Sequence, residues 1–296
     1  PYRIADHISK IGDQTGISVE VVDCRDSFQK HVVDYFVETY RIGRTPNPCM
    51  ICNPRIKFGK ILRHAEELGA DSLATGHYAR RFRDEQGRYH LRGGIDHKKD
   101  QSYFLGFLNQ DQLAAARFPL GEMTKTQVIA FAEEKGLTPL TQSESQDVCF
   151  IRHRTYGEFL TSQKGFTARP GLIEDSRGKI IGEHPGLHLF TVGQRKGINC
   201  PATEPYYVKS LDAARNRLIV GFKKELGTST CRVVDVNWIC PMPVEPVRVQ
   251  TRVRYRSRAI PSLLTPVGKQ EASIRFETGQ TAITPGQAAV FYHQDE

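Results

Sequence analysis

Apolar residues recur at helical spacing in the first half of the chain, and short apolar runs separate these stretches. The spacing of three to four predicts helices over residues 4–11, 28–40 and 56–68. Alternating or wholly apolar runs predict strands over residues 17–22 and 71–75, the second of them buried. This order of helix and strand predicts an α/β domain with a parallel sheet covered by helices on both faces.

The same pattern continues with a hairpin and shorter helices. Two runs, 79–83 and 88–92, flank the turn residues 84–87 and predict a β-hairpin. Apolar spacing predicts further helices over residues 103–108, 124–135 and 155–162.

The pattern changes at Arg169, where Gly and Pro become frequent and short alternating strands replace helices. We therefore predict an α/β domain over residues 1–163, a central β-rich domain over 164–226 and a C-terminal β-barrel over 227–296. Strands are predicted at residues 206–208, 217–220, 231–239, 247–254, 272–276 and 288–292.

One C-terminal stretch is marked by charge. At a period of two, five arginines of residues 248–258 share one predicted strand face, where they repel each other unless an anion binds. Arginine can bind phosphate in a bidentate manner, and Tyr255 offers a ring for stacking. A solvated polar face is the alternative interpretation. The arginines are Arg248, Arg252, Arg254, Arg256 and Arg258.

Composition narrows the class of partner. The 296 residues carry a formal net charge of +8, which favours a polyanion, and nucleic acid before a membrane, because no apolar run of membrane length occurs. The seven cysteines are odd in number and widely scattered, and no signal peptide is apparent. A reducing cytoplasm with thiols therefore fits better than a disulfide scaffold.

A proline-rich stretch delivers two cysteines to a predicted helix start. Pro46 and Pro48 exclude a helix or an interior strand before Cys49 and Cys52, which are spaced as CxxC. A helix is then predicted to begin at Asn53, its N-cap, so that the helix dipole would favour a thiolate at the cysteines. A rigid loop with two structural cysteines is the alternative.

Two further positions allow more than one interpretation. Cys149 lies in the short apolar run 148–151, where a cysteine is more often a core residue than a reactive one. Gly76 and His77 follow a predicted strand at the edge where ligands bind in parallel sheets, although a histidine there is often structural.

Six motifs, in this order and spacing, resemble those of the tRNA-specific 2-thiouridylases of the MnmA/TrmU type. They cover the chain from about residue 17 to 292 and read GRTPNPCMICNPRIKFG, ATGHY, KKDQSYFL, SQDVCFI, GQRKG and TPGQAAVFY. The resemblance implies an adenine nucleotide alpha hydrolase-like α/β domain and ATP-dependent 2-thiolation of the tRNA wobble uridine. It also implies that Cys52 and Cys149 are the catalytic cysteines, with sulfur arriving on Cys149 as a persulfide from a donor protein.

Binding residues are carried over from the same motifs. The resemblance implies ATP with Mg²⁺ as the nucleotide, bordered by Gly76. It implies tRNA contacts at Asn47, Pro48, Cys49, His77, Lys99, Asp100, Gln101, Arg254, Tyr255 and Gln287. A low thiol pKa near arginines and a helix start is expected to assist the cysteines.

The chain departs from the family pattern in two places. Cys49 stands where many members carry Asp, so Cys49, Cys52 and Cys149 could instead hold a metal or an iron–sulfur cluster. The family's glycine- and serine-rich pyrophosphate loop is not found either. From this we expect that the printed chain alone binds tRNA but neither binds ATP at micromolar levels nor thiolates. A non-catalytic RNA-binding module is the alternative of a different class.

Overall fold

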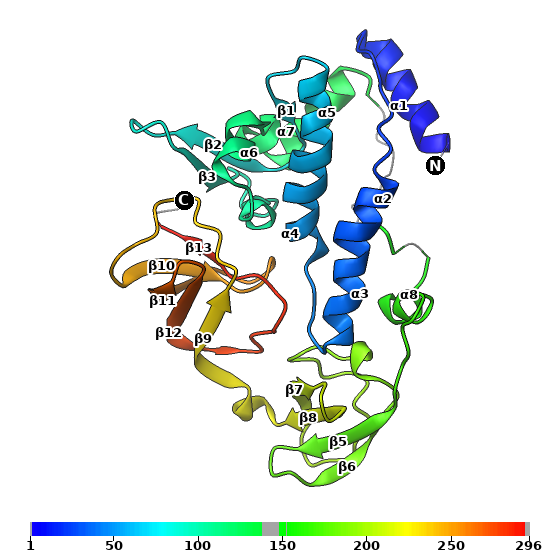
Figure 1. Ribbon diagram of the computed structural model, residues 1–296, viewed down its shortest axis with the longest axis vertical. Coiled ribbons are helices and arrows are strands. Elements are labelled where there is room, and N and C mark those ends of the chain that lie inside the picture. The colour runs from blue at the N-terminus through cyan, green and yellow to red at the C-terminus, as the bar shows by residue number, and fades with distance from the viewer. Residues whose placement is uncertain (1, 138–147, 152, 294–296) are drawn as a thin grey trace.

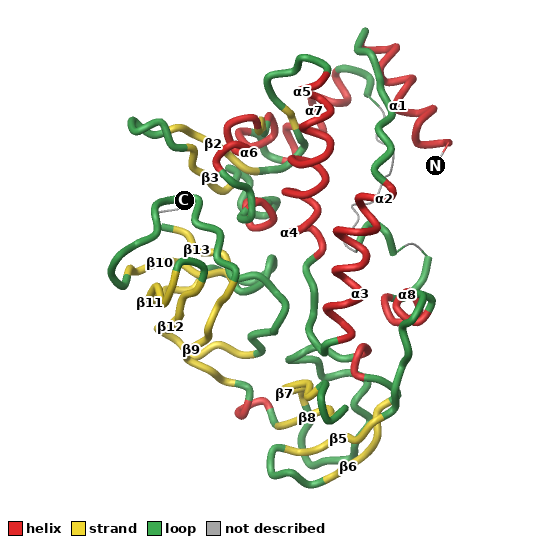
Figure 2. Tube along the Cα trace, viewed as in Figure 1, coloured by secondary structure: helices red, strands yellow, loops and turns green. Residues whose placement is uncertain are grey.

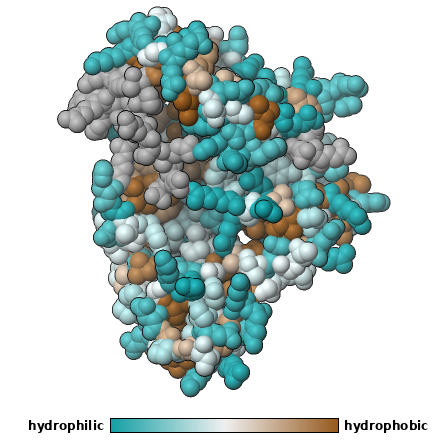
Figure 3. Space-filling view, turned by 180° about the vertical axis from the view of Figure 1, so that it is seen from behind, coloured by the Kyte–Doolittle hydropathy of each residue, from teal (hydrophilic) through white to brown (hydrophobic). Residues whose placement is uncertain are grey.

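The computed structural model describes residues 2–137, 148–151 and 153–293. Figure 1 shows two long helices in the middle of the molecule, a small β unit below them and a larger sheet beside them. The tube in Figure 2 shows how much loop connects these parts. The face in Figure 3 is mostly hydrophilic, with separate apolar patches.

The first long helix confirms the prediction for residues 28–40. Helix α1 (Tyr2–Thr15) precedes it, and α2 (Arg25–Phe28), the π-helical η1 (Gln29–Val33) and α3 (Asp34–Arg41) follow one another without a break. Its buried face carries Val33, Phe36 and Tyr40, which pack against Phe159. Burial of this apolar stripe is what the helical period in the sequence indicated.

The second long helix begins earlier than the sequence indicated. Helix α4 (Pro48–Cys52) runs into the π-helical η2 (Asn53–Ile61) and then α5 (Leu62–Glu67). The prediction of a start at Asn53 was wrong because Pro48 already occupies the first helical turn, where its missing N–H is not needed. Asn53 instead lies inside the helix, with its side chain donating to the Phe104 carbonyl oxygen at 2.8 Å.

The strand predicted at residues 17–22 is wrong. Ile17 and Val21 are 67% and 77% exposed and belong to an extended segment without assigned strand pairing. A strand needs a neighbour to take its backbone hydrogen bonds, and within the described part of the chain β1 (Leu73–Ala74) pairs only with β4 (Ala116–Arg117), in parallel. For the same reason β1 is not buried as predicted: Leu73 is half-buried and Ala74 is exposed.

The remaining elements of this domain are short. The hairpin β2 (Ala79–Arg83) and β3 (Tyr89–Gly93) is confirmed, as are helices near residues 124–135 and 155–162. Residues 103–108 form only a short 3-10 turn rather than a full helix. The elements are η3 (Ser102–Leu105), α6 (Gln110–Ala115), η4 (Pro119–Glu122), α7 (Lys125–Glu134) and α8 (Tyr156–Thr161).

The central unit is a four-stranded sheet in the order β6-β5-β8-β7. Its core contains Ile173, Val208, Leu218 and Val220, each fully buried. Strands β5 and β8 are parallel, and the other pairs are antiparallel. The elements are β5 (Gly171–Asp175), β6 (Ile180–His184), η5 (Leu187–Leu189), β7 (Tyr207–Asp212) and β8 (Arg217–Gly221).

The C-terminal sheet has the order β13-β10-β11-β12-β9. It encloses a core with Leu264, Ala272 and Ile274 at its centre. The sequence pattern does not predict β11. The residues of β11 follow the arginine-rich stretch 248–258, which is predicted as one strand face. After η6 (Lys223–Glu225), the strands are β9 (Gly227–Val234), β10 (Val247–Arg252), β11 (Ile260–Gly268), β12 (Glu271–Thr281) and β13 (Val290–Tyr292).

Candidate active site

The proline loop before α4 is held by the C-terminal domain. The Thr45 N–H donates to the Pro285 carbonyl oxygen at 2.9 Å. The Gln287 side-chain amide donates to the carbonyl oxygens of Thr45 and Pro46 at 3.0 and 2.9 Å. Gly286 has φ +94°, and a Cβ there would lie 2.7 Å from the Thr45 carbonyl oxygen, so only glycine fits. Two motifs whose bonded residues are 241 and 242 positions apart thus form one structure, in which Gln287 positions the loop.

The three motif cysteines lie in one region. Cys49 is exposed and Cys52 half-buried, both in α4, while Cys149 lies in an exposed turn. A negative charge on Cys149 would raise the pKa of both helix thiols, so the three cysteines interact electrostatically. Phe150 fixes this turn, because its ring packs edge-on against Phe36 of α3 at 5.3 Å between centroids. The structure therefore brings together cysteines that the sequence placed in separate motifs.

Burial opposes ionisation of the helix thiols. Desolvation by the surrounding chain raises the pKa of Cys52 to about 11, and it also raises the pKa of Cys49, although part of Cys49 reaches the surface. The expectation of low thiol pKa values at a helix start was therefore wrong for these two residues. Cys52 is the fifth helical residue, beyond the first turn in which the helix dipole acts strongly.

Lys57 is the cation that counters this burial at both thiols. Its charge lowers the pKa of Cys49 and of Cys52. Lys57 lies five residues after Cys52, within the π-helical segment, where i→i+5 bonding brings residues five apart to one side. An α-helix would turn them well apart. Gly59 allows this widened turn, because a Cβ there would lie 2.7 Å from the Pro54 carbonyl oxygen.

His77 holds the Lys57 side chain in place. Its Nε2 lies 3.2 Å from Lys57 Nζ, and its Nδ1 lies 2.8 Å from Thr75 Oγ1. Because the ammonium group can only donate, Nε2 accepts and Nδ1–H donates to Thr75. The ring is only 7% exposed, and burial together with Lys57 lowers the pKa of His77 to about 3. His77 is thus a neutral, internal residue in this structure.

The burial of neutral His77 predicts an acid-sensitive stability. Its folded pKa lies below the unfolded value, so the unfolded state binds the extra proton and stability falls as pH decreases from about 6.5 towards 3. When the pH is lowered from 7 to 5, the unfolding free energy of the wild-type protein should fall by about 1–2 kcal/mol more than that of His77→Gln. Urea unfolding at the two pH values measures this. An identical loss in both proteins would contradict the assignment of a neutral histidine.

The motif residues Lys99, Asp100 and Gln101 do not form an exposed group. The Asp100 side chain is buried and accepts from the Ser102 N–H at 3.0 Å and from Arg252 Nη1 at 2.7 Å. Gln101 accepts the Tyr78 N–H at 3.1 Å. Lys99 is half-buried. Of these contacts, the one between Asp100 and Arg252 joins the α/β domain to the C-terminal sheet.

The arginine-rich segment does not form a single strand face, so that prediction was wrong. Strand β10 ends at Arg252, which turns inward to Asp100, and the following residues form turns. Arg254 donates to the carbonyl oxygens of Val192, at 3.1 Å, and of Ala282. The Tyr255 ring contacts Phe104, with centroids 4.3 Å apart.

Gly76 suits the predicted nucleotide position, whereas the three motif cysteines do not suit a metal site. Gly76 is exposed at the carboxyl end of β1, and a Cβ there would meet only Leu120 Cδ1 at 3.7 Å, which leaves room for a ligand. Among the described residues, no group of three or more His, Cys, Asp or Glu side chains is arranged to hold a metal ion. The cluster alternative on the three motif cysteines therefore does not fit.

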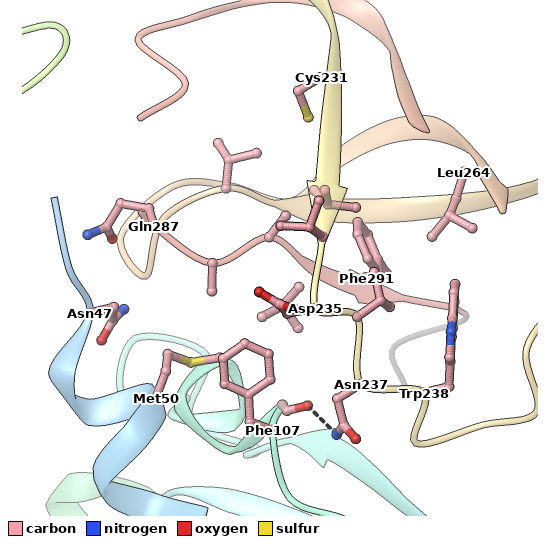
Figure 4. A pocket seen from close by; sticks show the side chains of 18 of the residues that line it. Asn47, Met50, Phe107, Cys231, Asp235, Asn237, Trp238, Leu264, Gln287 and Phe291 are labelled. Atoms are coloured by element: carbon pink, nitrogen blue, oxygen red, sulfur yellow. Dashed lines mark hydrogen bonds between the residues drawn. The ribbon is translucent and has the colours of Figure 1, made fainter. Parts of the chain in front are cut away.

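A cavity of about 1240 Å³ lies between α3, α4 and the C-terminal sheet. Asn47 and Gln287 lie on one side of it, and Cys231 and Leu264 on the other (Figure 4). Met50 and Phe107 form part of its apolar wall. Cys52 and Cys149 do not line it, so the cavity adjoins the cysteine region through the proline loop.

Sequence reasoning missed two interactions in this region. It noted the charge of Lys57 but not its contact with His77, which joins residues twenty apart. It also missed Cys24, whose charge would raise the pKa of Cys52. Neither interaction has a local signal in the sequence, because each depends on how two elements pack.

Among the described residues, no helix has the length and apolar character needed to cross a membrane.

Residues 3–153 match the family described as tRNA methyl transferase HUP domain. Residues 158–222 match the tRNA methyl transferase PRC-barrel domain, and residues 228–296 the aminomethyltransferase beta-barrel domain. The α/β class followed by two β-rich units is thereby confirmed.

Curated relatives extend over almost the whole chain. A tRNA-specific 2-thiouridylase MnmA of Desulfosudis oleivorans is 52% identical over 295 residues, which cover all of this chain and 82% of the relative. Proteins of the same name from a Synechococcus species and from Geobacter metallireducens are 46% and 44% identical, covering 96% and 97% of this chain and 78% of each relative. The chain belongs to the tRNA-specific 2-thiouridylase family.

Proposed function

We propose that this protein replaces the C2 oxygen of a tRNA wobble uridine with sulfur, in an ATP-dependent reaction. The observation that supports this proposal is that Cys52, beside the proline loop, and Cys149 lie in one region, where a charge on Cys149 would raise the pKa of Cys52, in a member of a thiouridylase family. Incubation of a protein that carries this chain together with the family's pyrophosphate loop, with unmodified tRNA, ATP and a persulfide donor, tests the proposal. Mass analysis of the digested tRNA then reports 2-thiouridine.

ATP serves as a substrate that activates the uracil oxygen. Oxygen is a poor leaving group from a uracil carbonyl, and adenylation converts it to one that leaves with AMP. The open backbone at Gly76, after the carboxyl end of β1, supports a nucleotide position there. Mg²⁺ would accompany the nucleotide as the counter-ion of its phosphates.

Sulfur reaches the base through the two cysteines. In our proposal a donor protein leaves a persulfide on Cys149, and its outer sulfur attacks C2 of the activated uracil. The Cys52 thiolate then attacks Cys149 Sγ. The S–S bond between Cys149 and the sulfur on C2 breaks, and 2-thiouridine is released. The products are the modified tRNA, AMP, the pyrophosphate released by adenylation, and a Cys52–Cys149 disulfide, which an external reductant returns to two thiols.

Binding of tRNA would use the surface around the cysteines. We propose that Asn47, Pro48 and Cys49 border the target base, because they form the start of α4 beside Cys52. His77, Lys99, Asp100, Gln101, Arg254, Tyr255 and Gln287 remain proposed contacts, although most engage other parts of the chain in this structure. The net charge of +8 supports a polyanionic substrate. The cytoplasm remains the proposed compartment.

Lys57 gives this proposal a specific electrostatic test. Replacing Lys57 with Met removes the cation that lowers the pKa of Cys52, so alkylation of Cys52 at pH 9 should slow about three- to tenfold. Lys60→Met is a matched control, because Lys60 Nζ instead donates to the Asp23 carbonyl oxygen at 2.6 Å. Peptide mass spectrometry after limited alkylation measures both rates. Equal slowing in the two variants would refute the role of Lys57.

A further inference from the structure

A second group of reactive side chains lies away from the cysteine region. Cys240 Sγ is 3.5 Å from His90 Nδ1, and His90 Nε2 is 2.7 Å from Asp84 Oδ2. The three residues come from the loop after β9, strand β3 and the hairpin turn before it. A thiol, an imidazole and a carboxylate in this order form the arrangement of an activated nucleophile, its base and the group that orients the base.

The carboxylate determines which imidazole nitrogen can act as a base. Asp84 is ionised at neutral pH, because its hydrogen bond with His90 lowers the pKa of its carboxyl group. An ionised carboxylate can only accept, so neutral His90 carries its proton on Nε2. Its Nδ1 lone pair is then directed at Cys240 and can take the thiol proton.

The arrangement is fixed on both sides. The Ile239 carbonyl oxygen, next to Cys240, accepts from Arg88 Nη1 at 2.9 Å and from Gln110 Nε2 at 3.0 Å. The Phe82 ring stacks on the His90 ring, with centroids 4.8 Å apart and planes at 15°. These contacts fix the loop that carries Cys240 relative to the His90 ring, across the boundary between two domains.

Access distinguishes Cys240 from several other cysteines. Cys240 is exposed, and it lines the cavity described above together with His90. Burial raises the pKa of Cys231 to about 11 and also raises the pKa of Cys200, so these thiols are poorer nucleophiles. The cavity offers space beside Cys240 for the group that an exchange reaction would add.

We propose that Cys240 is a thiol–disulfide exchange site that takes small disulfides, with His90 as its general base and Asp84 as the group that orients His90. His90 Nδ1 takes the Cys240 proton, and the thiolate sulfur attacks one sulfur of the disulfide. The S–S bond of the disulfide breaks, and a mixed disulfide forms on Cys240. The departing thiolate receives the proton from His90, so that one sulfur is oxidised and one is reduced.

The test uses the complete protein and glutathione disulfide as the probe. After acid quenching at early times, peptide mass spectrometry should find the mixed disulfide on Cys240 at a rate about tenfold above that of half-buried Cys24. His90→Gln should lower the Cys240 rate about tenfold, and Asp84→Asn several-fold. His97→Gln, at an exposed histidine of the same domain, should leave it unchanged.

The internal cysteines separate a chemical role from a structural one. In a folded variant, the rates at Cys24 and Cys231 stay at their wild-type values while the rate at Cys240 falls. If His90→Gln raises the rate at Cys231, that variant is not intact. Asp84→Asn then serves as the test, because it keeps the shape of the side chain, and the rates at Cys24, Cys231 and Cys240 are compared in the same way. Wild-type reactivity of Cys240 in a folded His90→Gln protein, or earlier modification of Cys24, would overturn the proposal. Neither result depends on thiolation of tRNA.

Discussion

Replacing either Cys52 or Cys149 with Ser should abolish 2-thiouridine formation. A hydroxyl group cannot carry the persulfide at position 149, and at position 52 it cannot break the S–S bond that holds sulfur to the base. We expect activity to fall by at least about a thousandfold, the scale seen when a covalent catalytic group is removed. The affinity for tRNA should stay within a few-fold of the wild-type value, because Cys→Ser replaces one sulfur atom with oxygen and removes no charge. Mass analysis of digested tRNA and a binding titration measure the two quantities.

Cys24→Ser is the matched control for these variants. Cys24 is half-buried at the start of α2 and close enough to influence the pKa of Cys52, yet it has no step in the proposed reaction. It should retain most of the thiolation activity. Normal 2-thiouridine formation by Cys52→Ser or Cys149→Ser would refute their assignment as catalytic residues.

Replacing Arg252 with Met should lower the free energy of unfolding by about 3–5 kcal/mol. Arg252 Nη1 and Asp100 Oδ2 are 2.7 Å apart, and their side chains are only 17% and 9% exposed. Removal of the guanidinium leaves the Asp100 carboxylate buried without its cation, and that uncompensated charge is the source of the loss. The Tyr255 carbonyl oxygen also loses its donor, since Arg252 Nη2 lies 2.7 Å away. Urea unfolding followed by fluorescence measures the change.

Arg248→Met provides the control on the same strand. Arg248 is exposed on β10, so its replacement should change the unfolding free energy by less than about 0.5 kcal/mol. If Arg252→Met proves as mild as Arg248→Met, the ion pair does not join the two domains as described.

The long helices could be predicted because each buries a continuous apolar stripe. Phe36 and Tyr40 recur at helical spacing and do pack in the core. The strand at residues 17–22 could not be judged in the same way, since a strand depends on a partner that local pattern does not specify. The start of α4 was misplaced because both Pro48 and Pro54 suit a first helical turn, and the sequence gives no means to choose between them.

Site chemistry was less predictable than site membership. Motif resemblance predicts Cys52 and Cys149 as the catalytic cysteines, which stays a prediction, and the structure places the two residues in one region. The thiol pKa was misjudged because sequence shows nearby charges but not the burial of Cys52. The pairing of Arg252 with Asp100 was equally hidden, because it joins residues 152 positions apart. Such contacts follow from domain packing, which no local period encodes.

A single turnover without reductant tests the central claim most directly. The full protein, loaded with persulfide on Cys149, is mixed with unmodified tRNA and ATP, quenched with an alkylating agent and digested under non-reducing conditions. We predict about one 2-thiouridine per protein molecule, accompanied by an equal amount of peptide disulfide between Cys52 and Cys149. Formation of 2-thiouridine while both cysteines remain as alkylated thiols would contradict the account.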